Sequence, residues 1–332
     1  KEIDKIVLNE QFEFLKSTVK ENIQDNLINL TFDINESEKF YIEKINILGN
    51  NITRDEVIRN NLLIDEGDAF NELLQTRTLN NLKSLNFFSN VESKILDSKT
   101  ENKKIINITV EEKPTGEIMA GAGVGTNGGT VVFGISENNF LGNGIQLSSN
   151  ASISAESLKG LISLKNPNYK GSNRSLNGSL ESVVTDRLTN FGYKSSKTGF
   201  SIGSGFEFYD DLYWNTGISS YVEKLDTDTT ASASMKKQEG SYFDTFFNQT
   251  FSYDKRNQIY KTSDGYISRF TQNIPLISEN YTLTNSYNYK IYNEWLDENV
   301  LTIGFFGKTS NSLSGKNIKL SDRLYLPASK LR

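Results

Sequence analysis

The sequence contains no cysteine and no histidine. Without cysteine the chain cannot form disulfides, thiolate nucleophiles or zinc–thiolate sites, and without histidine it lacks the commonest general base and metal ligand. These absences remove the usual equipment of most enzyme classes. We therefore expect a protein that is not an enzyme, with no catalytic residue, no cofactor and no metal site.

Long hydrophobic runs are also missing, since no stretch of about 18 consecutive apolar residues occurs, and a transmembrane helix is thereby excluded. A membrane-crossing strand needs only about 9 to 11 residues, so a mean hydropathy of -0.47 does not exclude a membrane protein. The net charge of -5 gives no electrostatic footprint for nucleic acid, and we expect no nucleic-acid partner. No signal segment opens the chain at Lys1 and no stop feature closes it at Arg332, so both ends are expected to be cut from a longer protein.

The aromatic composition favours strands over helices, since 15 Tyr and 20 Phe far outnumber the 2 Met and 2 Trp. A length of 332 residues suggests about two domains. An alternating apolar–polar pattern occurs in residues 28–32 and returns in residues 106–110, a separation wide enough for one small domain. We interpret this recurrence as a domain repeat.

Between these two segments the hydrophobic period changes several times. A strand over Tyr41–Leu48 ends at a Gly-Asn-Asn turn, and Thr53 with Glu56 fits a capping box at the start of a first helix. A second helix from Glu72 carries four residues on one face, Leu74, Thr78, Leu82 and Leu85. Two further strands are expected over residues 91–96 and 104–110. The predicted order is strand, helix, helix, strand, strand, an α+β domain with both helices on one face of a small sheet.

Beyond Pro114 the helical pattern gives way to strands of roughly 9 to 13 residues separated by Gly, Asn and Asp. One face of these strands is aromatic, as in Phe243, Phe247 and Phe251, and the other is small and polar. A soluble sandwich has shorter strands and a charged outer face, so the pattern favours an all-β antiparallel transmembrane barrel whose aromatic face meets lipid. We count about eleven strands, with expected starts near Glu117, Thr130, Gly144, Leu158, Asn173, Lys197, Leu212, Ser241, Gly265, Tyr281 and Asp297.

Several motifs follow one another in a characteristic order. The first domain contains INILGN at 45–50, EGDAFN at 66–71, LNFFSNV at 85–91 and VEEKPTG at 110–116. Later segments contain GAGVG at 121–125, NNFLGNG at 138–144, NPNY at 166–169, YDKRN at 253–257, SDGY at 263–266 and LYLPASKLR at 324–332. Together these motifs resemble the BamA family of outer-membrane assembly proteins, and the resemblance covers nearly the whole chain.

The resemblance implies a POTRA domain followed by a barrel of about sixteen strands, of which about eleven lie in this sequence. We assign residues 1–37 to the C-terminal part of a preceding POTRA domain and residues 38–113 to a complete POTRA domain of β-α-α-β-β order. Residues 114–332 are assigned to the N-terminal portion of the barrel, ending in a long extracellular loop. The implied location is the bacterial outer membrane, with the POTRA domain in the periplasm.

The family also implies a function, the assembly and insertion of β-barrel proteins into the outer membrane. The implied partners are unfolded outer-membrane protein clients, outer-membrane lipid and assembly-complex lipoproteins. A secretion or translocation pore of the same superfamily, for autotransporter assembly or two-partner secretion, is the alternative. A soluble periplasmic protein that only binds peptides is disfavoured by the aromatic outer face.

The first barrel strand carries the predicted client-strand seam, Gly121, Ala122, Gly123, Val124 and Gly125. Glycine offers no cross-strand packing and costs entropy, so a strand rich in it should separate readily from its neighbour. Close packing inside the barrel is the other reason for these glycines, and the sequence does not decide between the two. The segment also matches G-x-G-x-x-G, but a β-branched strand follows it instead of a helix, so we do not expect nucleotide binding.

A second candidate site is the family's early turn, Asn139, Phe140, Leu141, Gly142 and Gly144. We expect a tight turn that buries Phe140 and Leu141, rather than a contact surface.

Two charged features complete the candidate sites. Asp254 and Arg256 are expected to lie on one face of a strand and to form an ion pair in the lumen, rather than a catalytic pair. By resemblance, Arg332 is the tip residue of a loop that reaches into the lumen and pairs with a carboxylate on a missing late strand.

Overall fold

The computed structural model describes residues 15–24, 27–36, 40–125, 128–258, 262–296 and 299–324. The chain folds into two compact units. The first comprises Lys1–Gly116 together with Asn138–Gly144, and the second comprises Glu117–Glu137 together with Ile145–Arg332. The short segment Asn138–Gly144 therefore belongs to the first unit, although strands of the second unit flank it in the chain.

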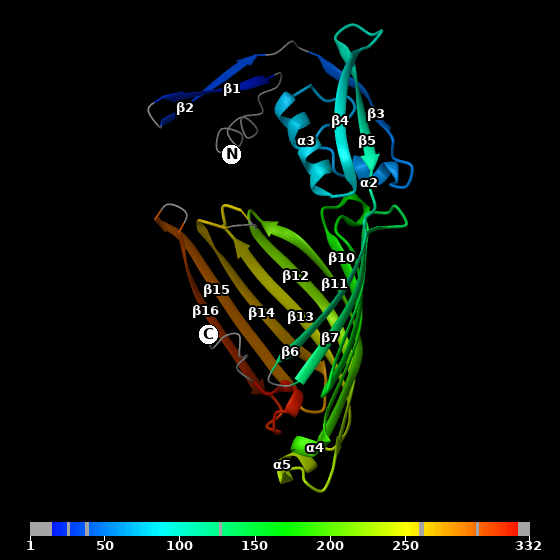
Figure 1. Cartoon of the computed structure of the whole chain (residues 1–332), viewed down its shortest axis with the longest axis vertical. Helices are drawn as coiled ribbons and strands as arrows, with labels where there is room; N and C mark the ends of the chain where they lie inside the picture. Colours follow the sequence, from blue (N-terminus) through cyan, green and yellow to red (C-terminus); the bar gives the residue numbers. More distant parts are fainter. Residues whose placement is uncertain are drawn as a thin grey trace. The chain divides into compact units, whose positions relative to one another are not determined.

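The first unit contains the predicted α+β domain (Figure 1). Its sheet has the order β3-β5-β4 among the described residues, with β3 parallel and β4 antiparallel to β5. Both helices lie between β3 and β4 in the chain, which confirms the predicted order, and both outer strands are edges of the sheet. The elements are β3 (Tyr41–Leu48), α2 (Asp55–Arg59), α3 (Glu72–Ser84), β4 (Phe88–Asp97) and β5 (Lys103–Glu112).

Helix α3 buries the face that the sequence predicted. Thr78 and Leu82 are fully buried, while Leu74 and Leu85 pack against the same core, because residues three or four positions apart share one helix face. The helix begins at Asn71, whose side chain accepts hydrogen bonds from the Leu73 and Leu74 amides. The buried core also includes Phe40, Ile42, Ile45, Ile58, Phe70, Phe87, Phe88, Ile106, Ile108 and Val110.

Within the described ranges, no helix combines the length and the apolar character needed to cross a membrane.

The predicted capping box at α2 is wrong. The residue before the helix is Arg54, which makes no side-chain capping bond. Thr53 lies one position earlier and is buried, and its backbone N–H donates to Glu112 Oε1 at 2.6 Å. The Thr53 side chain is also engaged, since it accepts a hydrogen bond from Asn139 Nδ2. Thr53 therefore connects separate segments of the first unit instead of starting the helix.

An antiparallel hairpin of β1 (Leu15–Gln24) and β2 (Leu27–Glu36) precedes the α+β domain. Val19 lies opposite Phe32 across the hairpin. Four of its large apolar side chains are about half exposed or more, namely Val19, Ile28, Leu30 and Phe32. One face of the hairpin is therefore apolar and uncovered among the residues that the structure describes.

The second unit is built on one antiparallel sheet, with eleven strands in the described part of the chain. Figure 1 shows these strands side by side in a curved sheet, in chain order from β6 at one edge to β16 at the other. Each strand begins within four residues of its predicted start. The bounds are β6 (Gly116–Gly125), β7 (Gly128–Phe140), β8 (Ile145–Ser154), β9 (Ser157–Asn166), β10 (Ser175–Arg187), β11 (Tyr193–Tyr209), β12 (Leu212–Thr227), β13 (Gly240–Asp254), β14 (Gly265–Ile277), β15 (Thr282–Leu296) and β16 (Asn299–Ser312).

The apolar face of this sheet lies uncovered. Trp214 stacks on Phe251 across β12 and β13, with 5.8 Å between the ring centroids. Phe200, Ile202 and Phe243 are exposed on the same side. Every strand has at least 10 residues and β11 has 17, so each is long enough to cross a bilayer. An uncovered aromatic face on strands of this length is the arrangement of a lipid-facing wall.

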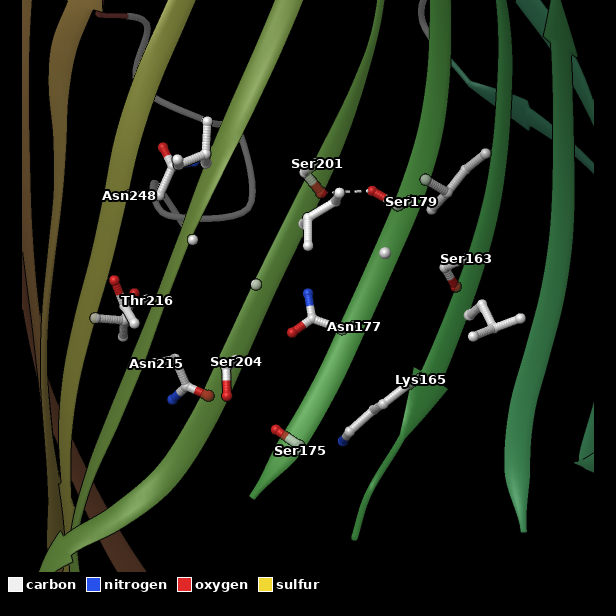
Figure 2. A pocket seen from close by; sticks show the side chains of 18 residues that line it. Ser163, Lys165, Ser175, Asn177, Ser179, Ser201, Ser204, Asn215, Thr216 and Asn248 are labelled. Atoms are coloured by element: carbon white, nitrogen blue, oxygen red, sulfur yellow. Dashed lines mark hydrogen bonds between the residues drawn. The ribbon is translucent and has the colours of Figure 1, made fainter. Parts of the chain in front are cut away.

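The opposite face of the sheet is polar and carries small side chains. Five serines occupy successive cross-strand positions from β8 to β12, namely Ser148, Ser163, Ser179, Ser201 and Ser219. Figure 2 shows part of this face, where the hydroxyls of Ser179 and Ser201 hydrogen-bond at 2.7 Å. The hollow drawn there is lined largely by serine, asparagine, threonine and glycine. The alternation read from the sequence is thus present as an apolar face and a polar face.

Candidate functional site

Strand β6 is an edge of the eleven-stranded sheet and pairs only with β7 among the described strands. Its large apolar side chains make few contacts, since Ile118 is 85% exposed and Val124 is 93% exposed. Ala122 is exposed as well. An edge strand presents unpaired N–H and C=O groups to any further strand that approaches it. The strand predicted to be the seam is one of the two edges of the described sheet, and β16 is the other.

Two glycines of β6 have open surroundings in the described part of the chain. A Cβ atom placed on Gly121 or Gly123 would meet no heavy atom within 4 Å. By contrast, a Cβ on Gly199 in β11 would lie 2.1 Å from the Ser220 carbonyl oxygen, so strands genuinely approach each other there. Among the described residues, nothing packs closely on Gly121 or Gly123, and Gly125 is the last residue of β6.

The turn after β7 is held by Asn139, which is 6% exposed. Its Nδ2 donates to Thr53 Oγ1 at 2.8 Å, and its Oδ1 accepts from the Gly144 amide at 2.7 Å. The Arg54 amide donates to the Gly142 carbonyl at 2.9 Å. These bonds all lie within the first unit, so the turn packs on the segment between β3 and α2.

The prediction that this turn buries Phe140 and Leu141 is wrong. Leu141 is 73% exposed and has a φ of 53°, and Phe140 is only half-buried. The buried members are Asn139, Gly142 and Gly144. A Cβ on Gly142, which has a φ of 70°, would lie 2.0 Å from the Ile52 carbonyl oxygen. The turn is therefore a contact surface formed by backbone and amide groups, the alternative that the sequence pattern disfavoured.

Glu112 binds the segment on which this turn packs, and the sequence analysis did not identify it. Its carboxylate accepts hydrogen bonds from three consecutive amides, those of Asn51 and Ile52 at 2.8 Å and that of Thr53 at 2.6 Å. Partial burial of Glu112 opposes its ionisation, but the hydrogen bonds from Thr53, Ile52 and Asn51 outweigh it and hold the pKa of Glu112 below the ordinary glutamate value. The VEEKPTG motif was the only signal in the sequence, and it does not reveal these partners.

The ion pair of Asp254 and Arg256 is confirmed, but its position differs from the prediction. Arg256 donates through Nε and a terminal nitrogen to the two carboxylate oxygens, at 2.8 and 2.6 Å. Asp254 is the last residue of β13, and Arg256 lies beyond the strand. The pair therefore closes the start of a turn instead of joining two positions on one strand face.

Two further predictions, the loop-tip arginine and the G-x-G-x-x-G match, concern residues that the structure does not describe or describes only in part. Arg332 lies outside the described residues, as do Thr126 and Asn127 in the G-x-G-x-x-G match. The segment after that match, Gly128–Phe140, is a strand, so no helix N-terminus is present to hold a phosphate. Among the described residues, no group of three or more acidic side chains is arranged to hold a metal ion.

The geometry defines a class of protein. A three-stranded α+β domain is followed by long antiparallel strands with an uncovered aromatic face and a small, polar opposite face. Sheets of this kind are built for a bilayer. The chain is an outer-membrane barrel protein that carries a folded domain ahead of its first barrel strand.

Two family models match the chain. The Omp85 superfamily domain matches residues 139–331, and the POTRA model, a surface antigen variable number repeat, matches residues 40–113. Because the first match covers more than half of the sequence, the chain belongs to the Omp85 superfamily. The predicted family, fold class and location in the bacterial outer membrane, with the POTRA domain in the periplasm, are confirmed.

Two curated relatives are named outer membrane protein assembly factor BamA. The protein from Nitratidesulfovibrio vulgaris is 25% identical over 77% of this chain, and the protein from Neorickettsia risticii is 26% identical over 80% of it. The chain spans only 32% and 36% of the lengths of these relatives.

Solved structures share the fold. BamA from Haemophilus ducreyi lacking POTRA domains 1-3 matches with a TM-score of 0.72 at 21% identity, over 96% of this chain and 66% of that chain. CdiB from Acinetobacter baumannii matches with a TM-score of 0.53 at 12% identity, over 99% of this chain and 62% of that chain. At these identities the similarity concerns the fold alone.

Proposed function

We propose that this chain is part of an assembly factor that inserts β-barrel proteins into the outer membrane. The observation that carries the proposal is the glycine-rich composition of β6, in which Gly121 and Gly123 provide no side chain for packing across strands. Unpaired backbone groups in lipid are costly, so a seam can open only where its closed state is already weakly paired. The residues proposed for this seam are Gly121, Ala122, Gly123, Val124 and Gly125.

An open β6 would offer a template to the terminal strand of a client. The client strand would add to the sheet through backbone hydrogen bonds, which do not depend on its sequence. The driving force would be the client's own strand pairing and burial, so the protein would lower a kinetic barrier without consuming nucleotide. The client class is therefore unfolded outer-membrane proteins, and assembly-complex lipoproteins are the further partners that we propose.

The POTRA domain offers a receiving surface of the same chemistry. Strand β4 is an edge of its sheet and presents backbone groups on its outer side to a further strand. The outer side of β3 is partly occupied, because the Ile42 amide donates to the Asp68 carbonyl at 2.9 Å and the Gly67 amide donates to the Ile42 carbonyl at 2.8 Å. We assign residues 38–113 to this domain and residues 114–332 to the barrel portion. The uncovered apolar face of the β1–β2 hairpin supports the assignment of residues 1–37 to a preceding POTRA domain, since a complete domain would cover it.

Stiffening the seam tests this function. In the full-length protein, Gly121→Val with Gly123→Val should strengthen β6 by roughly 0.5–1 kcal/mol per site, because Val packs across strands and glycine does not. Insertion of an unfolded outer-membrane protein into vesicles should then slow by roughly five- to thirtyfold. Folding of the client is followed by its heat-modifiable mobility on gels.

Gly160 in β9 supplies the matched control. A Cβ atom placed on Gly160 would likewise meet no heavy atom within 4 Å, but this glycine lies in an interior strand. Gly160→Val should leave client insertion unchanged. Equal slowing by the β6 and β9 variants would contradict a special role for the edge strand.

A secretion pore is the second candidate function, and the polar face of the sheet favours it. The serines from β8 to β12 give this face small, uncharged side chains, along which an extended polypeptide could slide. In such a pore the client would contact the polar face instead of the β6 edge. Client contacts at Ser201 without contacts at Ala122 would favour the pore.

A further inference from the structure

The chain after β16 returns to the polar face of the sheet. Lys319 and Asp244 are each 3% exposed, and the Lys319 ammonium donates to the Asp244 carboxylate. Lys319 Nζ also lies 5.0 Å from the centre of the Tyr242 ring. Asp244 and Tyr242 belong to β13, so a residue of the loop is buried against a strand 75 positions earlier in the chain.

Neighbouring residues of the loop reach other parts of the same unit. The Leu320 amide donates to Gln238 Oε1 at 3.0 Å, and Ser321 Oγ donates to Glu223 Oε2 in β12 at 2.8 Å. Ser310 Oγ in β16 donates to the Asp322 carbonyl at 3.0 Å. The segment Ile318–Arg323 thus crosses from β16 to β13 and β12 on the polar face.

A buried ion pair is not explained by stability alone. Removing two charges from water carries a large desolvation penalty, and well-packed apolar residues of similar volume often serve stability equally well. The best-attested use of such pairs is to fix one arrangement among several, because a shifted chain would leave a buried charge without its partner. The other contacts of the segment Ile318–Arg323 with β12, β16 and Gln238 are single hydrogen bonds, which a shifted chain could exchange for others.

We propose that the Lys319–Asp244 pair is a buried latch that fixes the loop after β16 in one position on the polar face of β12 and β13. This inference is independent of the proposed function, since it concerns the loop and not the β6 edge. Lys319 acts as a positioning residue: the contacts of Leu320 and Ser321 follow from where Lys319 is held. Loss of either charge should release the segment while the strands remain paired.

Disulfide formation between loop and strand tests the latch. Ser321→Cys with Glu223→Cys replaces a side-chain pair already in contact, and the region contains no other cysteine. In the full-length protein in vesicles, Lys319→Met or Asp244→Asn should slow formation of this disulfide on the order of tenfold, within the range of a single coupling interaction. The exchanged pair, Lys319→Asp with Asp244→Lys, should restore the rate.

The chain offers a matched control in Lys255 and Asp211, an ion pair of the same chemistry that is largely exposed and joins two turns elsewhere. Lys255→Met should leave the disulfide rate unchanged. Unchanged rates in the Lys319 and Asp244 variants, equal slowing by Lys255→Met, or failure of the exchanged pair to restore the rate would each overturn the latch.

A fold control separates release of the loop from loss of the barrel. Thermal unfolding of each variant, followed by heat-modifiable mobility, should match that of the parent. Should a single variant fail to fold, Lys319→Met with Asp244→Leu replaces both charges by apolar side chains of similar size. A normal disulfide rate in that folded double variant would overturn the latch, and a slowed rate would support it.

Discussion

Glu112 binds three consecutive backbone amides in the POTRA domain, and this contact makes a prediction about pH. Its pKa is lowered in the folded protein, so the stabilisation is present above the unfolded pKa and is lost as the pH falls through the lowered folded value. Glu112→Gln should cost about 1–3 kcal/mol at neutral pH, because the amides lose a charged acceptor. The hydrogen-exchange rates of the Asn51, Ile52 and Thr53 amides measure this loss of stability. A difference in exchange rate between Glu112→Gln and the parent that persists at a pH well below the folded pKa of Glu112 would contradict the stabilising role of its carboxylate.

Gly142 is the residue of the turn that tolerates a side chain least. It has a φ of 70°, and a Cβ would lie 2.0 Å from the Ile52 carbonyl oxygen. Gly142→Ala should therefore destabilise the turn by more than about 1 kcal/mol, through both backbone strain and the clash. The rate at which a protease cleaves the segment Asn138–Gly144 measures this destabilisation of the turn. Gly121→Ala, where the space is open, should not destabilise its strand, and equal destabilisation at both sites would contradict this difference in packing.

The roles of single residues were harder to predict than their membership of a motif. Thr53 fits the pattern of a helix cap, yet Glu112 and Asn139, distant in sequence, take its hydrogen-bonding groups. Leu141 was expected to be buried because it is apolar, but its backbone has a φ of 53° in a turn whose inner positions are filled by glycine and asparagine. Both errors arose because tertiary partners override a local pattern.

At the scale of the element, the two faces of β13 should differ in their tolerance of charge. Phe247 pairs with Ile218 and Ile274 on the apolar face, whereas Asn248 donates to Ser219 on the polar face. Phe247→Arg should cost about 2–4 kcal/mol near the bilayer midplane, because a guanidinium would face lipid. Asn248→Arg should cost much less. A denaturant titration of the protein refolded into vesicles compares them, and equal costs would remove the lipid-facing assignment.

The strands were predictable because each carries its own signal. Period-two alternation and Gly, Asn or Asp turns depend only on neighbouring residues, so β12 and β14 begin at their predicted positions, Leu212 and Gly265. Helix α3 was predictable for the same reason, since its apolar face and its start at Glu72 are local features. The start of α2 was not, because its preceding Thr53 is engaged elsewhere. The openness around Gly121 and Gly123 also required the structure, since a sequence does not reveal what surrounds a glycine.

At the scale of the whole molecule, the structure adds contacts between segments that lie far apart in the chain. The return of the loop after β16 to β12 and β13 depends on charges in Lys319 and Asp244, and no periodic pattern connects them. The division into units has the same origin, because Asn138–Gly144 joins the first unit through Asn139 and Gly142. The family resemblance supplied the architecture, whereas such contacts required coordinates.

The central claim, that clients enter at the β6 edge, is tested most directly by disulfide trapping in the full-length protein. A cysteine placed by Ala122→Cys should form a disulfide with a cysteine in the terminal strand of a stalled outer-membrane protein client, because that strand would pair with β6. Phe247→Cys, in the interior strand β13, should form none. Equal trapping at both positions, or trapping only at Ser201→Cys on the polar face, would contradict insertion at the edge and favour passage through the lumen.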